Sequence, residues 1–299
     1  MNNPVIAVLG LGAMGLPMAT RLAQQFTVRG FDINPERLAL GAEAGVTSAG
    51  SAQEAATGAD IVLLAVRNRA QLEDALYGDS GVVAVLNPGA TILLTSTVGN
   101  DAVREVAAKL EADGLHLVDA PISGGPVRAG TGDLLITVGA TDEAYAVAEG
   151  ALDHLSSTLV RVGGKPGDGQ ALKTVNQLLC GVHIAAGAEA LALAEALGLD
   201  PKLALETLGA GAAASFMLGD RGPRMLQAYD EGGAEVKSRI DIFVKDMGIV
   251  NTAARTAGLA TPIAAAAAEG LFLIAQAGGQ AAMDDSSVIK VIAPTRRDG

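Results

Sequence analysis

Short apolar runs and amphipathic segments alternate along the first half of the chain. Mostly apolar runs that are bounded by Gly, Pro or polar residues are typical of buried strands. We predict strands over residues 5–9, 27–31, 61–66, 91–95, 115–119, 134–138 and 159–162. Helical spacing separates several of these runs, most clearly over 35–44 and 101–112. Strands that alternate with helices indicate an α/β Rossmann-type domain with a parallel, doubly wound sheet.

After residue 162 the pattern becomes helical throughout. A cluster of turn residues at 163–167 precedes one continuous helical pattern over 169–197, which spans about 43 Å at 1.5 Å per residue and predicts a long connecting helix. Further helices are expected over 201–209, 216–229, 239–258 and 261–276. We therefore predict a dinucleotide-binding domain at 1–163 and an all-α substrate and oligomerisation domain at 164–299. Ligand sites in such proteins favour the carboxyl ends of the strands and domain interfaces, so we expect the site in a cleft between the two domains.

The turn after the first predicted strand reads Gly-Leu-Gly-Ala-Met-Gly, and the second predicted strand ends at Asp32. In dinucleotide-binding units the three glycines permit a tight turn, a close approach of the pyrophosphate and close packing of helix on strand. The N-terminus of the next helix presents N–H groups and a partial positive charge to the phosphates. The acid is placed to accept hydrogen bonds from the adenosine ribose. The pattern predicts cofactor binding by Gly10, Leu11, Gly12, Ala13, Met14, Gly15 and Asp32.

Asp32 also bears on the choice of cofactor. A carboxylate beside the ribose repels a 2′-phosphate, so NAD is the predicted cofactor. Arg29 and Arg37 lie close in sequence and keep NADP as an alternative. The other interpretation, a glycine-tolerant turn without a ligand, fits the spacing and the terminal acid less well.

Composition and charge exclude several classes of partner. The 299 residues carry a net charge of −12 and no basic block, which argues against nucleic acid and anionic membranes. The single cysteine, Cys180, excludes a disulfide framework and is expected to be a buried, unreactive thiol. Three scattered histidines make a metal site improbable. The chain opens directly on a predicted strand and shows no uninterrupted apolar window of membrane-spanning length, so a cytoplasmic protein is expected.

Two further stretches have the residue types of a reaction site. Ser123-Gly124-Gly125 follows a predicted strand and offers a hydroxyl and consecutive backbone N–H groups, an arrangement that suits a carboxylate. A purely structural turn is the alternative. Lys173 and Gln177 are four residues apart and share one face of the long helix. A lysine becomes a general acid or base when burial or a nearby cation lowers its pKa, although most such lysines simply extend to solvent.

A third stretch lies near the C-terminus. Asp241 and Lys245 are spaced for an i,i+4 ion pair on a helix surface, and that is the simplest interpretation of them.

Four motifs, in this order along the chain, resemble those of the β-hydroxyacid dehydrogenases, the group that contains 3-hydroxyisobutyrate dehydrogenase and tartronate semialdehyde reductase. They lie at Gly10–Met18, Asp119–Pro126, Gly167–Asn176 and Lys245–Asp246. The resemblance implies that Lys173 is the catalytic acid/base. It implies substrate contacts from Ser123, Gly124, Gly125, Asn176 and Gln177. It implies further cofactor contacts from Val66, Thr97 and Lys245.

Within that family the chain is most similar to the L-threonate dehydrogenases, notably over 176–186, 241–246 and 284–290. The family commonly has Asn where this chain has Gln177, which moves the amide outward by one methylene. The expected function is NAD-dependent oxidation of a four-carbon aldonate by a homodimer or homotetramer. The alternatives are a 3-hydroxyisobutyrate dehydrogenase, a tartronate semialdehyde reductase, a sugar-phosphate dehydrogenase and a non-catalytic dinucleotide-binding module. Imine reductases share the fold but usually lack this lysine.

Overall fold

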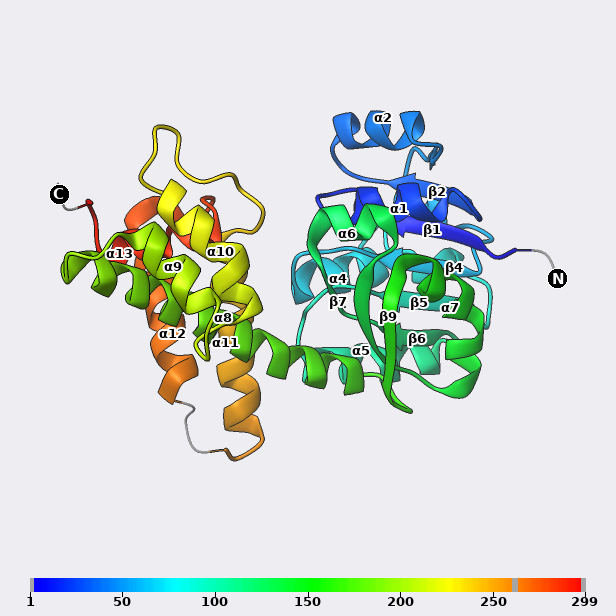
Figure 1. Cartoon of the computed structure of the whole chain (residues 1–299). Helices are drawn as coiled ribbons and strands as arrows, with labels where there is room; N and C mark the ends of the chain where they lie inside the picture. The colour runs from blue at the N-terminus through cyan, green and yellow to red at the C-terminus, as the bar shows by residue number, and fades with distance from the viewer. Residues whose placement is uncertain (1–2, 260–262, 297–299) are drawn as a thin grey trace. The chain divides into compact units, whose positions relative to one another are not determined.

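The computed structural model describes residues 3–259 and 263–296 of the chain. It separates into two compact units, residues 1–173 and 174–299 (Figure 1). The first unit is a Rossmann-type α/β domain and the second is helical, so the predicted fold class is confirmed. The first unit extends past the predicted division at residue 163 and includes the first turns of the helix α8, Asp168–Ala196.

A single sheet forms the centre of the first unit. Six of its strands are parallel in the order β3-β2-β1-β4-β5-β6. They are β1 (Val5–Leu9), β2 (Thr27–Phe31), β3 (Thr47–Ser48), β4 (Ile61–Leu64), β5 (Thr91–Leu94) and β6 (His116–Asp119). Every residue of β4 and β5 is buried, as expected for the unbroken apolar runs of central parallel strands. Their carboxyl ends therefore meet along one edge of the sheet.

The rest of the sheet departs from the predicted parallel arrangement. Strand β8 (Leu134–Gly139) runs antiparallel to β6 and β7 (Ile122–Ser123), and β9 (Ser156–Gly163) then pairs parallel with β8. The short connection 124–133 explains why β8 is antiparallel to β7, because a parallel neighbour needs a crossover of a dozen or more residues. An apolar run has the same sequence pattern in parallel and in antiparallel strands, so the sequence did not predict which kind of pairing β8 forms.

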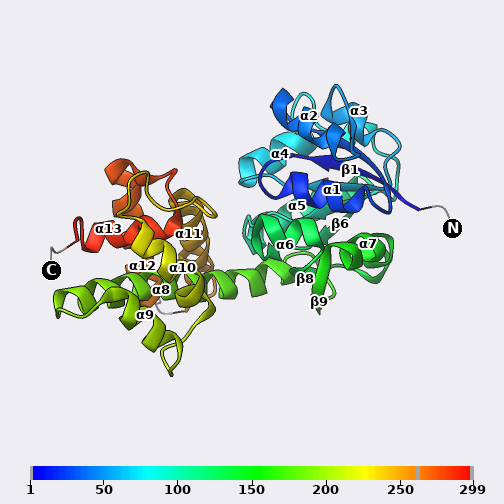
Figure 2. The same ribbon diagram turned by 45° about the horizontal axis from the view of Figure 1, so that its top comes forward.

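Alternation along β1 divides the core between the two faces of the sheet. Ile6 and Val8 pack with α1 (Gly15–Leu22), α6 (Gly125–Thr131) and α7 (Asp142–Leu155). Ala7 and Leu9 pack with α3 (Ala52–Ala56), α4 (Arg69–Tyr77) and α5 (Asn100–Ala112). Both views show helices on either side of the strands (Figures 1 and 2). The sheet is thus covered on both faces, which leaves its carboxyl edge as the place for ligands.

The second unit packs its helices around an apolar core that includes a stacked pair, Phe243 and Phe272, with ring centroids 5.2 Å apart. After α8 its main helices are α9 (Pro201–Gly209), α10 (Phe216–Gln227), α11 (Ile240–Thr256) and α12 (Ile263–Ala275), with a short α13 (Ile289–Ile292). The predicted helix over 261–276 begins at residues outside the described part of the chain. Helix α8 is long and apolar enough to span a membrane by length and composition alone, a test that core helices of soluble proteins also pass.

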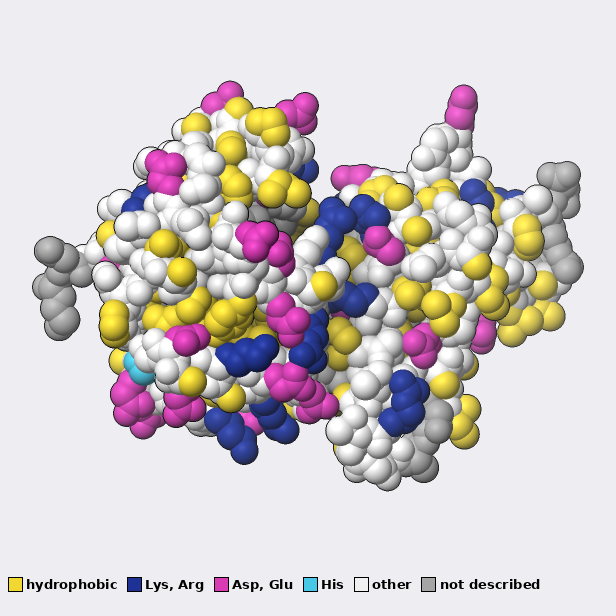
Figure 3. Space-filling view, turned by 180° about the vertical axis from the view of Figure 1, so that it is seen from behind, with side chains coloured by type: hydrophobic (Ala, Val, Ile, Leu, Met, Phe, Trp, Pro, Cys, Tyr) yellow, Lys and Arg dark blue, Asp and Glu magenta, His cyan; other side chains and the backbone are white. Residues whose placement is uncertain are grey.

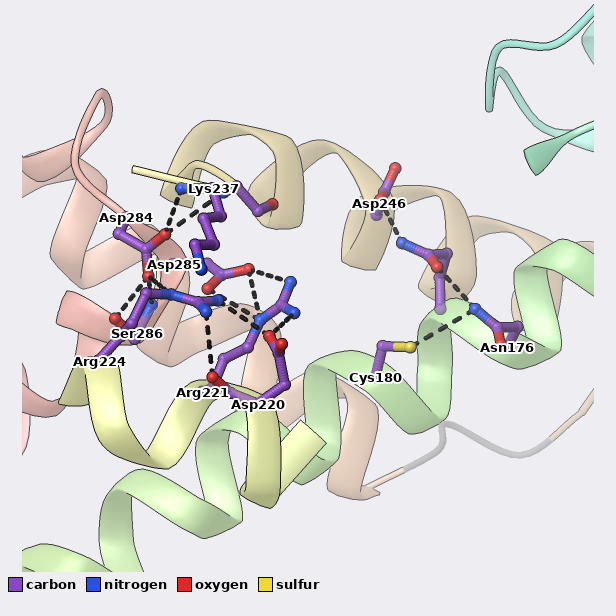
Figure 4. A network of polar contacts seen from close by, with 12 residues as sticks. Asn176, Cys180, Asp220, Arg221, Arg224, Lys237, Asp246, Asp284, Asp285 and Ser286 are labelled. Atoms are coloured by element: carbon purple, nitrogen blue, oxygen red, sulfur yellow. Dashed lines mark hydrogen bonds and ion pairs between the residues drawn. The ribbon is translucent and has the colours of Figure 1, made fainter. Parts of the chain in front are cut away.

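Buried charges tie α10 to the 3-10 turn Asp285–Val288 (Figure 4). Arg224 donates from Nε to Asp284 Oδ1 over 3.1 Å, and Arg221 donates to both carboxylate oxygens of Asp285. The Asp284 carboxylate also accepts the backbone N–H groups of Lys237 and Ser286. Each of these buried charges therefore has several partners, as a folded core requires.

Candidate active site

The glycine-rich turn joins β1 to α1 with two glycines that packing requires. Gly10 has φ +92°, and a Cβ there would lie 2.7 Å from the carbonyl oxygen of Ala65. A Cβ on Gly15 would collide with the carbonyl of Gly10. Both positions thus exclude a side chain whether or not a ligand is bound.

Gly12 differs from its two neighbours in this turn. A Cβ on Gly12 would meet no protein atom within 4 Å, so the space above it is open. Helix α1 has no side-chain N-cap and no acidic residue in its first turn. An open approach beside an uncapped helix N-terminus fits a pyrophosphate group, which agrees with the predicted cofactor role.

Asp32 lies directly after β2 and is bound to the glycine-rich turn. Its Oδ2 accepts the backbone N–H of Leu11 at 2.6 Å, and its Oδ1 accepts that of Asn34 at 2.8 Å. These bonds fix the carboxylate at the carboxyl edge of the sheet. Arg29 donates instead to the carbonyl of Thr57 at 2.8 Å, and Arg37 is half-buried on α2 (Pro35–Glu43).

Val66 and Thr97 follow the carboxyl ends of two adjacent strands, β4 and β5. The backbone N–H of Val66 donates to Ser96 Oγ at 2.8 Å and so ties the two strand ends together. Both predicted cofactor contacts therefore lie at the same edge of the sheet as Asp32.

The turn at Ser123, Gly124 and Gly125 leads from β7 into α6. Gly124 has φ +143° and Gly125 has φ +75°, both in the range that favours glycine. Lys173 Nζ donates to Ser123 Oγ over 2.8 Å, and the lysine is only 8% exposed. The fold thus brings together two predicted site residues that are 50 positions apart in sequence.

Asp119 ends β6 beneath this turn and is fully buried. Its Oδ2 accepts the backbone N–H groups of Gly167 at 3.0 Å and Gln170 at 2.8 Å, at the start of α8. Burial raises the pKa of Asp119 to about 6, against the hydrogen bonds from Gln170 and Gly167, which lower it. At neutral pH the group is therefore mainly a carboxylate, bound to the helix that carries Lys173.

The remaining predicted residues form a polar chain within the second unit (Figure 4). Gln177 donates from Nε2 to Asp246 Oδ2 at 2.5 Å, and Asn176 Nδ2 donates to Gln177 Oε1 at 2.9 Å. Lys245 Nζ lies 2.8 Å from Asp246 Oδ1. Asn176 also donates to the sulfur of Cys180 at 3.4 Å. The cysteine is half-buried rather than buried as predicted.

Asp241 and Lys245, the residues of the predicted i,i+4 ion pair, each have another partner of opposite charge. Asp241 pairs with Arg239, and Lys245 pairs with Asp246. Arg239 immediately precedes α11 and donates to the Asp241 carboxylate. The spacing of residues within a helix does not reveal such a neighbour.

Sequence reasoning assigned no role to four residues that the structure places in these networks. They are Ser96, Asp119, Gln170 and Asp246. Asp119 and Asp246 stand inside the motifs, beside residues that were singled out. For Asp119, an acid at the end of an otherwise apolar run was the available signal.

Comparison with known proteins identifies the family of the chain. Residues 5–164 match the NAD-binding domain of 6-phosphogluconate dehydrogenase. Residues 167–292 match the family described as the NAD-binding domain of NADP-dependent 3-hydroxyisobutyrate dehydrogenase. The chain belongs to the 3-hydroxyisobutyrate dehydrogenase-like family of β-hydroxyacid dehydrogenases. It is therefore an NAD(P)-binding oxidoreductase that acts on a CH–OH group.

Two members of this family with an assigned activity match the chain over nearly its whole length. An L-threonate dehydrogenase of Cupriavidus necator is 38% identical over 287 residues, which cover 96% of this chain and 95% of that protein. An L-threonate dehydrogenase of Escherichia coli is 34% identical over 290 residues, with 96% and 94% covered. The predicted resemblance to this subgroup is confirmed.

Solved structures agree with the fold. A 3-hydroxyisobutyrate dehydrogenase from Salmonella typhimurium matches with a TM-score of 0.87 at 34% identity, over 96% of this chain and 99% of that one. The Mycobacterium tuberculosis 3-hydroxyisobutyrate dehydrogenase with L-serine has a TM-score of 0.85 at 28% identity, over 98% and 99%. An imine reductase from Pseudomonas sp. shares the fold at 24% identity, with a TM-score of 0.63 over 97% and 100%.

Proposed function

We propose that the protein is an NAD-dependent dehydrogenase of a small polyhydroxy acid, specifically a four-carbon aldonate such as L-threonate. The observation that carries the chemistry is the 2.8 Å contact between Lys173 Nζ and Ser123 Oγ. It holds a nearly buried amine against a hydroxyl at the start of a glycine turn. An amine beside a carboxylate-binding turn is what proton transfer from a hydroxy acid needs.

In the proposed mechanism the Ser123 hydroxyl and the N–H groups of Gly124 and Gly125 bind the substrate carboxylate. Neutral Lys173 accepts the proton of the substrate hydroxyl at Nζ while the carbon–oxygen bond becomes a carbonyl. When bound, the oxidised nicotinamide supplies the acceptor for the hydrogen that leaves carbon with its electron pair. In the reverse direction Lys173 donates the proton from its ammonium form.

For the cofactor we propose a preference for NAD over NADP. Asp32 is fixed beside the glycine-rich turn by Leu11 and Asn34, where a 2′-phosphate would meet its negative charge. The guanidinium of Arg29 is bound to Thr57 and so does not offset that charge. NADP remains the alternative, because Arg37 lies on α2, the helix that follows Asp32.

For the substrate, the names of the relatives at 34% and 38% identity favour L-threonate. Gln177 bonds to Asp246, and a shorter Asn at this position would not span the same distance. The second candidate is 3-hydroxyisobutyrate, because solved structures of 28% and 34% identity carry that name. Tartronate semialdehyde fits the same chemistry. A non-catalytic dinucleotide-binding module would have no need of the contact between Lys173 and Ser123.

We further propose a cytoplasmic homo-oligomer without nucleic-acid or membrane partners. Acidic and basic side chains are interspersed on the face seen in Figure 3, and the net charge is −12. A surface of this kind suits small-molecule substrates better than polyanions.

Replacement of the lysine tests the mechanism. Lys173→Met should lower kcat for L-threonate with NAD by about 10²- to 10⁴-fold, the range typical of a lost general base. Binding of NADH, followed by its fluorescence, should change little. Lys202→Ala, an exposed lysine on α9, is the matched control and should retain full turnover. Normal turnover by a folded Lys173→Met protein would contradict the assignment.

A further inference from the structure

The side-chain amide of Gln170 is fully buried, and every hydrogen-bonding position on it is used. Oε1 accepts the backbone N–H groups of Val98 at 3.0 Å and Gly99 at 3.1 Å. Nε2 donates to the carbonyl of Ser96 at 3.0 Å and to Asp119 Oδ1 at 2.9 Å. Two lone pairs and two N–H groups are all that an amide offers. This one side chain therefore binds the loop after β5 to the end of β6.

The backbone fixes the direction of these bonds. Val98 and Gly99 only donate, so Oε1 of Gln170 must face them and Nε2 must face the other way. Asp119 must then accept from Nε2, while its second oxygen accepts the backbone N–H groups of Gly167, just before α8, and of Gln170 in its first turn. An asparagine side chain at residue 119 would place an N–H against the N–H of Gln170. The network is therefore satisfied only by an acceptor at 119 and a donor at 170.

This network connects the places where the proposed reactants bind. The Ser96 hydroxyl oxygen accepts a hydrogen bond from the backbone N–H of Val66. Thr97 lies between Ser96 and Val98 in the same loop. Gln170 precedes Lys173 by three residues, so both lie on one side of α8. Gly169 presses the same turn against the sheet, because a Cβ there would lie 2.8 Å from the carbonyl of Asp119. A single polar network thus links the predicted nicotinamide loop to the lysine.

We infer that Asp119 and Gln170 are positioning residues. They fix the position of Lys173 relative to the loop 96–99, as proton transfer requires. The inference rests on the proposed role of Lys173. Neither residue touches the reacting atoms. Each acts through the first turn of α8, and a misplacement of about 1 Å at a reacting group can cost about 100-fold in rate. This positioning role is a physical reason for a buried acid at residue 119.

A reciprocal exchange of donor and acceptor tests the inference. Asp119→Asn and Gln170→Glu each create a clash of like groups and should lower kcat by about 10- to 100-fold. In the double variant the new amide at residue 119 would donate to the new carboxylate at residue 170. The other oxygen of that carboxylate would accept the N–H groups of Val98 and Gly99, but the oxygen in the place of Nε2 would face the carbonyl oxygen of Ser96, so one contact between two acceptors would remain. The double variant relieves the contact between two acceptors at residue 119 and should therefore be at least about tenfold faster than Gln170→Glu alone.

Three readouts separate positioning from mere stability. The single variants should raise the primary deuterium isotope effect on kcat/KM with carbon-deuterated L-threonate, because the misaligned chemical step becomes limiting. Their affinity for NADH, measured by fluorescence, should stay within about twofold, since Asp32 and Gly12 are untouched. Val106→Ala, at a buried core position of α5, is the control. It should lower the melting temperature and leave kcat and the isotope effect unchanged.

Unchanged kcat and isotope effect in the folded single variants would overturn the inference. A double variant no faster than Gln170→Glu would also overturn it. If Gln170→Glu alone does not fold, a folded and active double variant supports the inference, and a folded but inactive one refutes it. Turnover at the wild-type rate by a folded Lys173→Met protein would refute the proposed role of Lys173, on which the inference rests. An inactive Lys173→Met with a fully active Asp119→Asn would refute only the positioning roles.

Discussion

Glycines within one turn have different physical roles, and the structure separates them. Gly15 is required by packing, since a Cβ there would collide with the carbonyl of Gly10. Gly12 has an open space above it and no positive φ. A glycine-rich motif read from sequence treats both alike, because the spacing says nothing of the atoms that surround each Cα.

We predict opposite outcomes for two alanine substitutions in this turn. Gly15→Ala should destabilise the fold by about 1–3 kcal/mol, the usual range for overpacking, and lower the melting temperature. Gly12→Ala should leave the melting temperature nearly unchanged but weaken NADH binding about tenfold or more, because its methyl group enters the space for the pyrophosphate. Thermal unfolding and fluorescence titration measure the two effects. Equal losses of stability in both variants would contradict the distinction.

At the scale of elements, the first turn of α8 depends on one buried acid. Folding takes Asp119 out of water and raises its pKa from 3.8 to about 6. A raised carboxyl pKa means that the folded protein favours the protonated form. The contribution of this group to stability is therefore fully present below about pH 4 and is lost as the pH rises through 6.

The size of this effect follows from the shift. About two pKa units correspond to about 3 kcal/mol. We predict that the unfolding free energy of wild type minus that of Asp119→Asn falls by about this amount between about pH 4 and pH 7. Urea unfolding at several pH values measures the difference, and the variant removes the titrating group while it keeps all others. A difference that is flat or rises with pH would rule out a raised pKa.

The elements themselves were largely predictable from the sequence. Strands β1 and β2 and helix α9 have the predicted bounds, and α8 spans Asp168–Ala196 against an expected 169–197. The two-residue strands β3 and β7 escaped prediction because two residues carry no alternation. The antiparallel pairing of β8 escaped it because apolar runs do not encode direction.

The hydrogen-bond networks of the site were harder to predict from the sequence than its motifs. Ser123 and Lys173 were singled out from the residues themselves, and the structure brings them together. The bonds of Gln170 join residues 96, 98, 99 and 119, which only the folded sheet brings near to α8. Sequence patterns report local spacing, so contacts between distant segments required the tertiary structure.

At the scale of the whole molecule, the family fixes the reaction class, and the site residues suggest the substrate. The NAD(P)-binding domain and the relationship to L-threonate dehydrogenases define an oxidoreductase. Gln177 and its bond to Asp246 belong to the proposed substrate site. The claim that ties these scales together is Lys173-dependent oxidation of a tetronate with NAD.

The most direct test is NADH formation by the purified protein with a panel of C3 to C6 hydroxy acids. The panel contains both enantiomers of threonate, erythronate, glycerate and 3-hydroxyisobutyrate, each with NAD and with NADP. We predict that L-threonate with NAD gives the highest kcat/KM and that 3-hydroxyisobutyrate is turned over poorly. A preference for 3-hydroxyisobutyrate or glycerate would contradict the substrate assignment, and no turnover of any acid would contradict the proposed function as a whole.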